Sequence, residues 1–412
     1  MKPDATVPEH VPNNLVCPFS YWTSPGMASA PHSDPHAALK QLRDLPPIFW
    51  APGNTFDGQG TWMVTRAFDM RTVLQDTDTF TSNRQFFSPL VGGTWPLIPL
   101  ELDPPEHTKF RALINPMFGP KRMNAMLAVI RERAASMIDE LRPRGSCDLM
   151  NDFAFPFAVG IFLQFLGIQT DRLKEFVDWG NKLLHAPRSR ERRAAAISII
   201  EFLENLFERR RHEPTDDVAT LLVQAQIDGK PLTRDELRGY GVLLFVGGLD
   251  TVANALGFDF RYLAEHPEEQ QRLRDHPELI PNAAEEMLRA YATVHMVRTA
   301  RRDTELQGIK IKAGDRVTCS SMVANRDPLE FADPDRIDFE REVNRHVAFS
   351  YGPHRCAGSH LARREVIAAL TEWLARMPPF RIKQGTAPIA NAGTVFGMQS
   401  LHLSWDGTAP QC

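Results

Sequence analysis

The chain has 412 residues, a formal net charge of −4, and a composition that is 43% hydrophobic and 24% charged. These values are typical of a soluble globular protein, and the acidic balance argues against a general nucleic-acid-binding function. The cysteines are odd in number and widely spaced, which argues against a disulfide framework or a zinc module and favours a reducing cytoplasm. They are Cys17, Cys147, Cys319, Cys356 and Cys412. The N-terminus has no apolar targeting segment, so we expect no membrane anchor.

The first hundred residues are rich in proline, glycine and aromatic residues, with short strand-like pieces such as Thr61–Thr65. From Glu106 onward, apolar residues recur with helical periodicity. The predicted helices are Glu106–Phe118, Arg122–Leu141, Asp171–Leu184, Arg190–Glu213, Asp217–Ile227, Glu268–Asp275, Leu279–Ala292 and Ser359–Met377.

A single long helix is predicted in the middle of the chain. Thr233 and Glu236 have the spacing of a capping box, and the helix that they open continues to His266, just before Pro267. The apolar run within it, Val242–Phe260, is interrupted by glycine, aspartate and asparagine, which indicates a buried core helix rather than a membrane span.

Two later regions favour β-structure, Val297–Ser321 with a turn at Lys312–Asp315, and the tail Phe380–Trp405. The stretch Asn325–Arg345 is irregular. We therefore expect one domain over residues 1–412, mainly α-helical with small β-sheets. Its parts would be a β-rich region over about 1–105, a helical region over about 106–380 and a C-terminal β-hairpin region over 381–412.

One cysteine lies in a loop suited to a negatively charged sulfur. Gly352 and Gly358 flank Cys356, directly before the helical run that starts at Ser359. Small residues let backbone N–H groups approach the sulfur, and the N-terminus of the following helix favours negative charge. A haem-thiolate iron site requires this setting.

The predicted long helix carries a polar interruption, Gly247-Gly248-Leu249-Asp250-Thr251. Two adjacent glycines in a helix cost about 1 kcal/mol each relative to alanine, which a stable protein tolerates where something must approach the backbone closely. The hydroxyl of Thr251 beside the carboxylate of Asp250 could bind a small polar ligand and relay protons to it. A helix-packing groove with a back-bonded threonine is an equally good interpretation of these residues alone.

Two charged pairs are weak signals on their own. Glu286 and Arg289 share a helix face at i and i+3, and His107 and Arg111 share another at i and i+4. The second pair could bind two carboxylates. A solvated surface pair is the alternative interpretation of both.

Together and in this order along the chain, these motifs resemble the cytochrome P-450 family of haem-thiolate monooxygenases over essentially the whole sequence. The most specific element is the cysteine loop, Phe349–Gly358. It departs from the family pattern at Ser350, where glycine is usual, and we expect only a slight adjustment of the loop. The resemblance implies the P-450 fold, with haem between the long central helix and the cysteine loop.

The resemblance also implies roles for matching residues in the cysteine loop and the long helix. Cys356 would be the proximal ligand of the haem iron, with Phe349 packed near its sulfur. Gly352 and Gly358 would permit the tight loop. Asp250 and Thr251 match the acid–alcohol pair that delivers protons during oxygen activation. The small residues that open the oxygen groove match Gly247 and Gly248.

Other matching residues would hold the haem and its surroundings. Glu286 and Arg289 match a structural, non-catalytic pair that locks the haem-side core to the stretch near Asn325–Arg336. The residues that match partners of the haem propionates are His107, Arg111, Arg298 and His354. Their donors would compensate two buried carboxylates.

Within the family the chain resembles the bacterial camphor-hydroxylating branch, sharing for example the phrases Val246–Val252 and His360–Glu365. The tyrosine that holds the camphor ketone there matches Trp95 here, an aspartate matches Met296 and a threonine matches Leu100. The pocket positions implied by the resemblance are Phe86, Trp95, Leu100, Leu243, Val246, Val294, Met296, Val395 and Phe396. This mostly apolar wall predicts a compact terpenoid-like substrate and disfavours camphor.

The resemblance implies haem b as the cofactor, O2 as co-substrate and a [2Fe–2S] ferredoxin as electron donor. The chain has no flavin or NAD(P)H fingerprint, so a separate NAD(P)H-dependent reductase would supply the ferredoxin. Lys109 and Arg111 would face this acidic partner, and we expect a cytoplasmic monomer. A peroxide-driven haem enzyme and a non-catalytic haem-based binder are alternatives. The presence of Asp250 and Thr251 argues against the first, and the lack of an appended output domain argues against the second.

Overall fold

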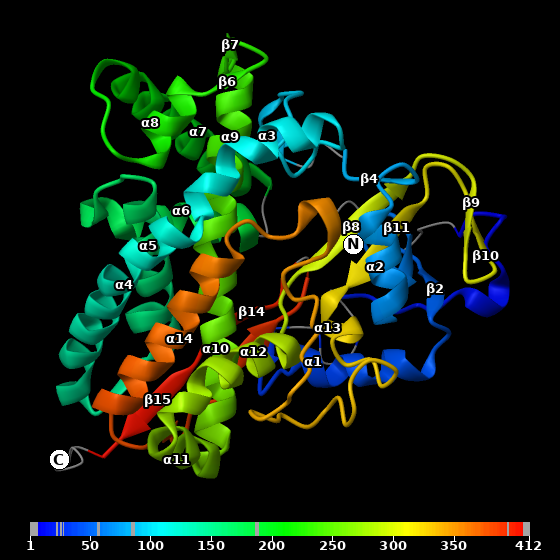
Figure 1. The fold of residues 1–412 in the computed structure, drawn as a ribbon. Helices are drawn as coiled ribbons and strands as arrows, with labels where there is room; N and C mark the ends of the chain where they lie inside the picture. The colour runs from blue at the N-terminus through cyan, green and yellow to red at the C-terminus, as the bar shows by residue number, and fades with distance from the viewer. Residues whose placement is uncertain are drawn as a thin grey trace.

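The computed structural model describes residues 7–21, 24, 27, 29–55, 58–83, 87–185, 189–393 and 395–406. Most helices gather on one side of the molecule and the largest sheet lies on the other (Figure 1). The helices are α1 (Pro35–Ala38), α2 (Ala67–Gln75), α3 (Glu106–Ile114), α4 (Pro120–Leu141), α5 (Phe155–Phe165), α6 (Leu173–His185), α7 (Ser189–His212), α8 (Val218–Gln224), α9 (Arg234–Leu249), α10 (Thr251–Glu265), α11 (Pro267–Asp275), α12 (Ile280–Ala290), α13 (Ser321–Ala324) and α14 (Ser359–Arg376). The mainly α prediction with small sheets is confirmed.

The strands are short and come from many parts of the chain. They are β1 (Ala30–Pro31), β2 (Ile48–Ala51), β3 (Thr61–Val64), β4 (Phe80–Thr81), β5 (Ser146–Asp148), β6 (Gln226–Ile227), β7 (Lys230–Pro231), β8 (His295–Ala300), β9 (Thr304–Leu306), β10 (Ile309–Ile311), β11 (Arg316–Ser320), β12 (Phe380–Ile382), β13 (Ile389–Asn391), β14 (Gly397–Ser400) and β15 (His402–Trp405). The largest sheet has the order β2-β3-β11-β8-β4. Every residue of β2 and β3 is buried, which accounts for their continuous apolar sequence.

The central helix begins as predicted and is divided in two. Thr233 accepts from the N–H of Glu236, and the Glu236 carboxylate accepts from the N–H of Thr233, so the capping box is confirmed. Asp250, with φ −115° and ψ −39°, separates α9 from α10. The combined stretch, Arg234–Glu265, is long and apolar enough to cross a membrane, but 67% of its most apolar window is buried inside the protein. This burial is typical of a core helix.

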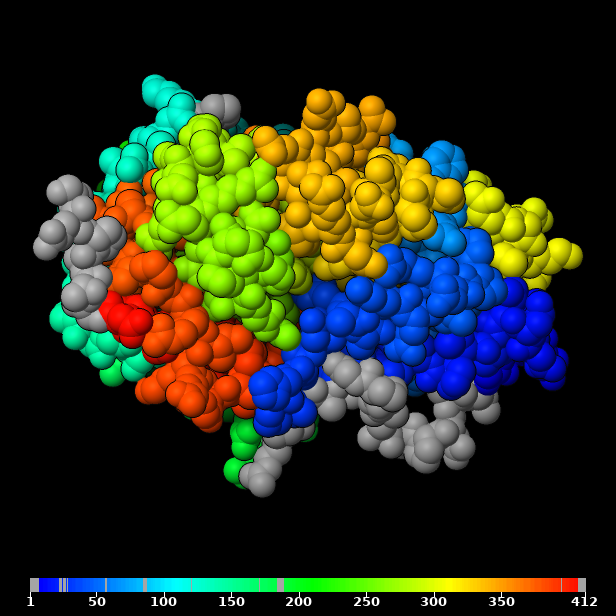
Figure 2. All heavy atoms as spheres, turned by 90° about the horizontal axis from the view of Figure 1, so that it is seen from below, coloured from blue at the N-terminus to red at the C-terminus, as the bar shows by residue number. Residues whose placement is uncertain are grey.

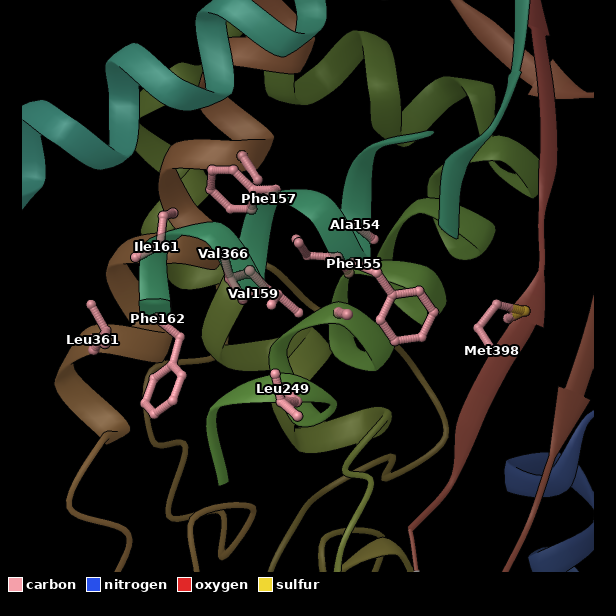
Figure 3. Close-up of a cluster of buried hydrophobic side chains, with 14 of the residues drawn as sticks. Ala154, Phe155, Phe157, Val159, Ile161, Phe162, Leu249, Leu361, Val366 and Met398 are labelled. Atoms are coloured by element: carbon pink, nitrogen blue, oxygen red, sulfur yellow. The ribbon is translucent and has the colours of Figure 1, made fainter. Parts of the chain in front are cut away.

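One buried helix, α5, has no counterpart among the predicted elements. Nine of its eleven residues are buried, so it shows no polar face, and a π-helical turn at Met150–Ala154 precedes it. Its side chains lie between Leu361 and Val366 of α14 and Leu249 at the end of α9 (Figure 3). A helix that is apolar all round gives no amphipathic signal, which is why periodicity alone missed it.

The irregular stretch predicted over Asn325–Arg345 is confirmed, since no helix or strand is assigned there. It lies at the surface beside the N-terminal part of the chain and beside α11 (Figure 2). Ion pairs fix both contacts, with Asp335 at 2.7 Å from Arg43 and Glu340 at 2.5 Å from Arg272.

Candidate active site

The cysteine loop is held tightly by the backbone on both sides. The N–H of Cys356 donates to the carbonyl oxygen of Phe349 at 2.9 Å. Gly352 has φ +69°, and a Cβ there would lie 2.6 Å from the carbonyl oxygen of Leu74 in α2. Only glycine fits, so the prediction that Gly352 permits the loop has a direct physical cause. Gly358 is different, because its φ is −77° and a Cβ would make only ordinary contacts at 3.7 and 3.9 Å.

Ser350 keeps a backbone conformation that glycine usually adopts. Its φ is +64°, in the left-handed region, and its hydroxyl is buried without a hydrogen-bond partner among the described residues. We expected a slight adjustment of the loop around this serine. Ser350 instead adopts the left-handed backbone conformation itself, at a cost on the order of 1 kcal/mol.

The sulfur of Cys356 lies beside open space within a cationic setting. The residue is exposed, although protein atoms surround the thiol closely enough for burial to raise its pKa. The N–H of Gly358 and the guanidinium groups of Arg111 and Arg355 oppose this rise. Arg363 covers the ring of Phe349, because its guanidinium carbon lies 4.5 Å from the ring centroid.

Three of the predicted propionate partners form one buried cluster, and Arg111 adjoins it. The rings of His107 in α3 and His354 in the cysteine loop lie 4.2 Å apart. Burial lowers the pKa of His354 to about 2, with help from the nearby charges of Arg298 and Arg111. Burial likewise lowers the pKa of His107 and of Arg298. The cluster thus combines two neutral imidazole rings with the guanidinium groups of Arg298 and Arg111.

Several donors in this cluster have no partner in the described part of the chain. Both ring nitrogens of His107 and Nε of Arg298 are buried without a hydrogen bond. Arg298 donates only to the backbone, from Nη1 to the carbonyl of Val297 at 3.0 Å. Ser82 lies 3.2 Å from Nε2 of His354. Arg111 is satisfied differently, by Asn115 at 2.7 Å and the carbonyl of Arg355 at 2.6 Å.

The two glycines before Asp250 serve different purposes. A Cβ on Gly248 would lie 2.2 Å from the ring of Phe162, so this glycine is required for packing α9 against α5. A Cβ on Gly247 would meet nothing within 4 Å. The prediction that both open a groove is therefore wrong for Gly248, where the packing interpretation holds, whereas Gly247 faces open space.

Asp250 and Thr251 lie side by side at the junction of α9 and α10. Asp250 is 4% exposed, and it borders a small cavity of about 10 Å³ shared with Asn181 and Leu249. The hydroxyl of Thr251 donates to the carbonyl of Gly247 at 3.3 Å, the back-bonded arrangement weighed above. That long bond leaves the hydroxyl near the open space beside Gly247.

Glu286 and Arg289 form a complete buried network. The guanidinium donates through Nε and Nη2 to both oxygens of Glu286 at 2.8 Å. Its remaining hydrogen bonds go to the carbonyls of Asn325 and Pro334 at 2.8 Å and of Arg336 at 3.1 Å. The surface alternative is wrong, since the two side chains are 0% and 1% exposed. The predicted contact with the stretch Asn325–Arg336 is present.

Comparison with known proteins decides the family. The family model for Cytochrome P450 matches residues 169–402, more than half of the chain. The chain belongs to the cytochrome P450 family. A probable cytochrome P450 127A1 from Sinorhizobium fredii is 52% identical over 401 residues, covering 97% of each chain. Linalool 8-monooxygenase from Pseudomonas putida is 34% identical, covering 81% of this chain and 86% of that protein.

A solved structure supports the same assignment. The crystal structure of cytochrome P450 CYP101C1 superposes with a TM-score of 0.86 at 33% identity, covering 97% of this chain and 100% of that one. The protein is therefore a cytochrome P450 monooxygenase of bacterial type, with haem b as cofactor and O2 as co-substrate.

The residues present in this P450 fit a haem group. Its two propionates need donors, and His107 and Arg298 offer buried nitrogens without partners. Its iron needs an axial sulfur, and Cys356 is exposed inside a cationic loop. Haem and O2 would also need open space, and among the described residues no atom lies within 4 Å of a Cβ built on Gly247.

The predicted substrate wall is partly open and partly core. Four of its apolar residues are only half-buried, namely Leu243, Val246, Val294 and Val395. Val294 and Val395 form an isolated antiparallel β-bridge. Phe396 is fully buried, and its ring packs against Tyr21, His36 and His295. Phe396 therefore belongs to the core, which corrects its assignment to the wall.

The remaining wall residues differ in exposure. Trp95 is 7% exposed and packs its indole over Gly93 and against Phe87. Leu100 is 44% exposed and Met296 is half-buried. Phe86 lies outside the described residues.

Sequence reasoning missed one residue that supports the cysteine loop. Glu285 accepts from Nη2 of Arg363 at 2.9 Å and lies 3.0 Å from Nε2 of His346. Burial raises the pKa of Glu285, but these hydrogen bonds outweigh it and hold the pKa at about 2. This carboxylate anchors the guanidinium that covers Phe349. The sequence carries one signal for Glu285, the doublet Glu285-Glu286. Adjacent side chains on a helix point in different directions, so the two carboxylates must have different partners.

Proposed function

We propose that this P450 hydroxylates a compact apolar substrate of terpenoid type, with Cys356 as the thiolate ligand of the haem iron. The observation that carries the proposal is that Cys356 lies near Arg111, which adjoins a buried cluster where the ring nitrogens of His107 and Nε of Arg298 have no hydrogen-bond partner among the described residues. Haem bound through a thiolate supplies the chemistry for cleaving O2 and inserting one oxygen atom. His107, His354, Arg298 and Arg111 would hold the propionates.

Asp250 and Thr251 are proposed to move protons toward bound oxygen. Asp250 is buried at the helix junction, beside the small cavity that Asn181 also lines. The Thr251 hydroxyl is loosely held by Gly247, at 3.3 Å, and can turn from that carbonyl to another acceptor. Glu286 and Arg289 would have no part in the chemistry and would hold the core that surrounds it.

The proposed substrate class follows from the residues that are predicted to form the wall of the substrate pocket. Its half-buried members Leu243, Val246, Val294 and Val395 carry no hydrogen-bonding side chain, so shape and apolar contact would select the substrate. Trp95 offers one indole N–H at most, and it is bulky. The name of the relative linalool 8-monooxygenase refers to a small terpenoid alcohol, which agrees with this class.

The proposed electron donor is a [2Fe–2S] ferredoxin, reduced by a separate NAD(P)H-dependent reductase, and the proposed setting is a cytoplasmic monomer. Arg111 and Arg355 lie beside the cysteine loop, so an acidic partner that docks there would approach the sulfur side. Lys109 is already paired with Asp228 at 2.5 Å, and a ferredoxin would have to compete for it.

Reconstitution with a ferredoxin and its reductase tests the proposal. We expect NADH-dependent hydroxylation by the haem-loaded protein, and a variant Thr251→Ala that consumes NADH but releases hydrogen peroxide, with product yield lowered about tenfold or more. Thr371→Ala is the matched control, because Thr371 is also back-bonded within a helix, to Ile367 at 2.7 Å, but in α14. It should couple NADH to product normally.

The alternatives give different results. A peroxide-driven enzyme would form product from hydrogen peroxide without ferredoxin and would tolerate Thr251→Ala. A non-catalytic binder would show no turnover with either oxidant. Spin-state titration tests the substrate class separately. A full shift with camphor at micromolar concentration, together with no response to less polar terpenoids, would contradict the proposed apolar wall.

A further inference from the structure

A surface hollow lies between α6 and α7, apart from the haem side of the molecule. Its volume is about 560 Å³, within the range of pockets that bind small molecules. One face of α7 supplies most of the lining, namely Ser198, Glu201, Phe202, Asn205, Glu208 and Arg209. Arg172, which directly precedes α6, and Trp179 in the middle of α6 supply the rest.

The floor of this hollow is aromatic and carries a fixed guanidinium. Arg172 lies over the rings of Phe202 at 5.2 Å and Trp179 at 5.6 Å. Its Nε donates to Glu175 at 2.6 Å, which fixes the plane of the guanidinium. Flat guanidinium and indole faces are surfaces on which a planar ring stacks. Beneath them, Phe176 is fully buried and contacts Phe245 of α9 at 5.8 Å, so packed rings separate the hollow from the central helix.

The charges that line the hollow are only partly compensated. Arg172 is paired with Glu175, and Glu208 is paired with Arg211 at 2.6 Å. Glu201 and Arg209 have no ion-pair partner within the described parts of the chain. They lie eight residues apart on the same face of α7, about 12 Å along the helix, so one end of the hollow is negative and the other positive.

We propose that this hollow binds a small zwitterion that carries an aromatic ring, such as an aromatic amino acid or a short peptide of one. The ring would stack on Arg172 and Trp179. The ammonium group would face Glu201 and the carboxylate would face Arg209. Ser198 and Asn205 lie along the same face of α7, where each offers hydrogen bonds to the polar part of the ligand.

Three probes that share a phenyl ring and differ in charge test this site. They are L-phenylalanine as zwitterion, phenethylamine as cation and 3-phenylpropanoate as anion. Isothermal titration calorimetry of the haem-loaded protein, with imidazole present to occupy the haem side, gives each affinity. We expect phenylalanine to bind about three-fold or more tightly than either singly charged probe, since each exposed charge pair contributes modestly to affinity.

Charge-removing variants then reverse the preference. Glu201→Gln should make 3-phenylpropanoate the tightest probe, and Arg209→Gln should make phenethylamine the tightest. Arg193→Gln, an exposed arginine of α7 outside the hollow, should change nothing. The proposal is overturned if no probe gives saturable binding, if the three probes bind equally, or if Glu201→Gln and Arg209→Gln keep the original order of affinities.

Discussion

Two buried charged networks in this P450 differ in how completely the protein satisfies them. Arg289 has five hydrogen bonds, to both oxygens of Glu286 and to three backbone carbonyls. Among the described residues Arg298, which is also buried, makes one hydrogen bond, and its neighbour His107 makes none. Burial of an unsatisfied polar group costs about 1–3 kcal/mol. A complete network therefore marks a structural role, and a buried guanidinium and imidazole with incomplete hydrogen bonding mark where an anionic ligand belongs.

The largest effect should come from breaking the complete network. Arg289→Met would leave the buried carboxylate of Glu286 facing only Arg341, Asn344 and a backbone N–H. We expect the free energy of unfolding to fall by about 3–5 kcal/mol, because the buried carboxylate loses its two-point partner and three backbone carbonyls lose a donor. Urea unfolding of the apoprotein measures this.

Lys182→Gln is the control for that variant. Lys182 pairs with Asp178 within one helix but is 53% exposed, and its loss should cost less than about 1 kcal/mol. Equal destabilisation by the two variants would contradict the structural role given to Arg289.

Removing a donor from the incomplete cluster should lower haem affinity and leave the stability of the apoprotein intact. Arg298→Met removes a buried charge with one backbone hydrogen bond, so the unfolding free energy of the apoprotein should stay the same or rise. Haem affinity should fall about tenfold or more, since a hydrogen bond to a charged group contributes about 1.5–3 kcal/mol.

Haem transfer to apomyoglobin measures this affinity, with Arg301→Met as the control. Arg301 is 44% exposed and pairs with Asp103, and its loss should leave haem affinity unchanged. An Arg298→Met apoprotein destabilised as strongly as Arg289→Met would show that Arg298 braces the protein itself.

His295 sharpens the comparison. Within the part of the chain that the structure describes, its buried ring nitrogens have no hydrogen-bond partner and no arginine or lysine contributes to its pKa shift. Its ring lies 3.8 Å from Tyr21, and burial lowers its pKa to about 3. Between pH 6.5 and pH 3 the imidazole of His295 therefore binds a proton in the unfolded chain and stays neutral in the folded chain. Stability from this residue is present above pH 6.5 and is lost as the pH falls toward 3.

The variant His295→Phe tests that assignment. Between pH 7 and pH 4 the apoprotein should lose about 3 kcal/mol less stability as His295→Phe than as wild type, measured by urea unfolding at each pH. Identical pH profiles would mean that His295 is not held neutral by its apolar surroundings.

The smallest effect concerns Ser350. Ser350→Gly removes both the left-handed strain and a buried unpartnered hydroxyl, so the apoprotein should gain about 0.5–1 kcal/mol. Ala357→Gly in the same loop is the control. Ala357 has a negative φ, and glycine there should be neutral or destabilising. A loss of stability on Ser350→Gly would assign the serine a contact that the protein depends on.

Most helix positions could be predicted, because amphipathic periodicity and end signals are local. The capping box at Thr233 and the start of α14 at Ser359 are examples. The helix α5 was missed because burial all round removes the periodic signal. The helix predicted over Asp217–Ile227 ends at Gln224, since Asp228 and Gly229 both adopt positive φ and turn the chain into the hairpin β6–β7.

The site residues were recognisable as motifs, but their geometry was not. Sequence alone left Glu286 and Arg289 as a possible surface pair, and only the packing of Asn325–Arg336 against them decides for burial. Likewise Gly247 and Gly248 look equivalent in the sequence. Their difference arises from Phe162, whose helix had no signal of its own.

The absorption spectrum of the reduced, carbon monoxide-bound protein tests the central assignment most directly. With Cys356 as thiolate ligand, the wild type should show the long-wavelength Soret band that thiolate ligation produces. Cys356→Ser should lose it, and Cys319→Ser, which changes a buried cysteine of β11, should keep it. A wild-type protein that binds haem without this band, or a Cys356→Ser variant that retains it, would contradict the assignment.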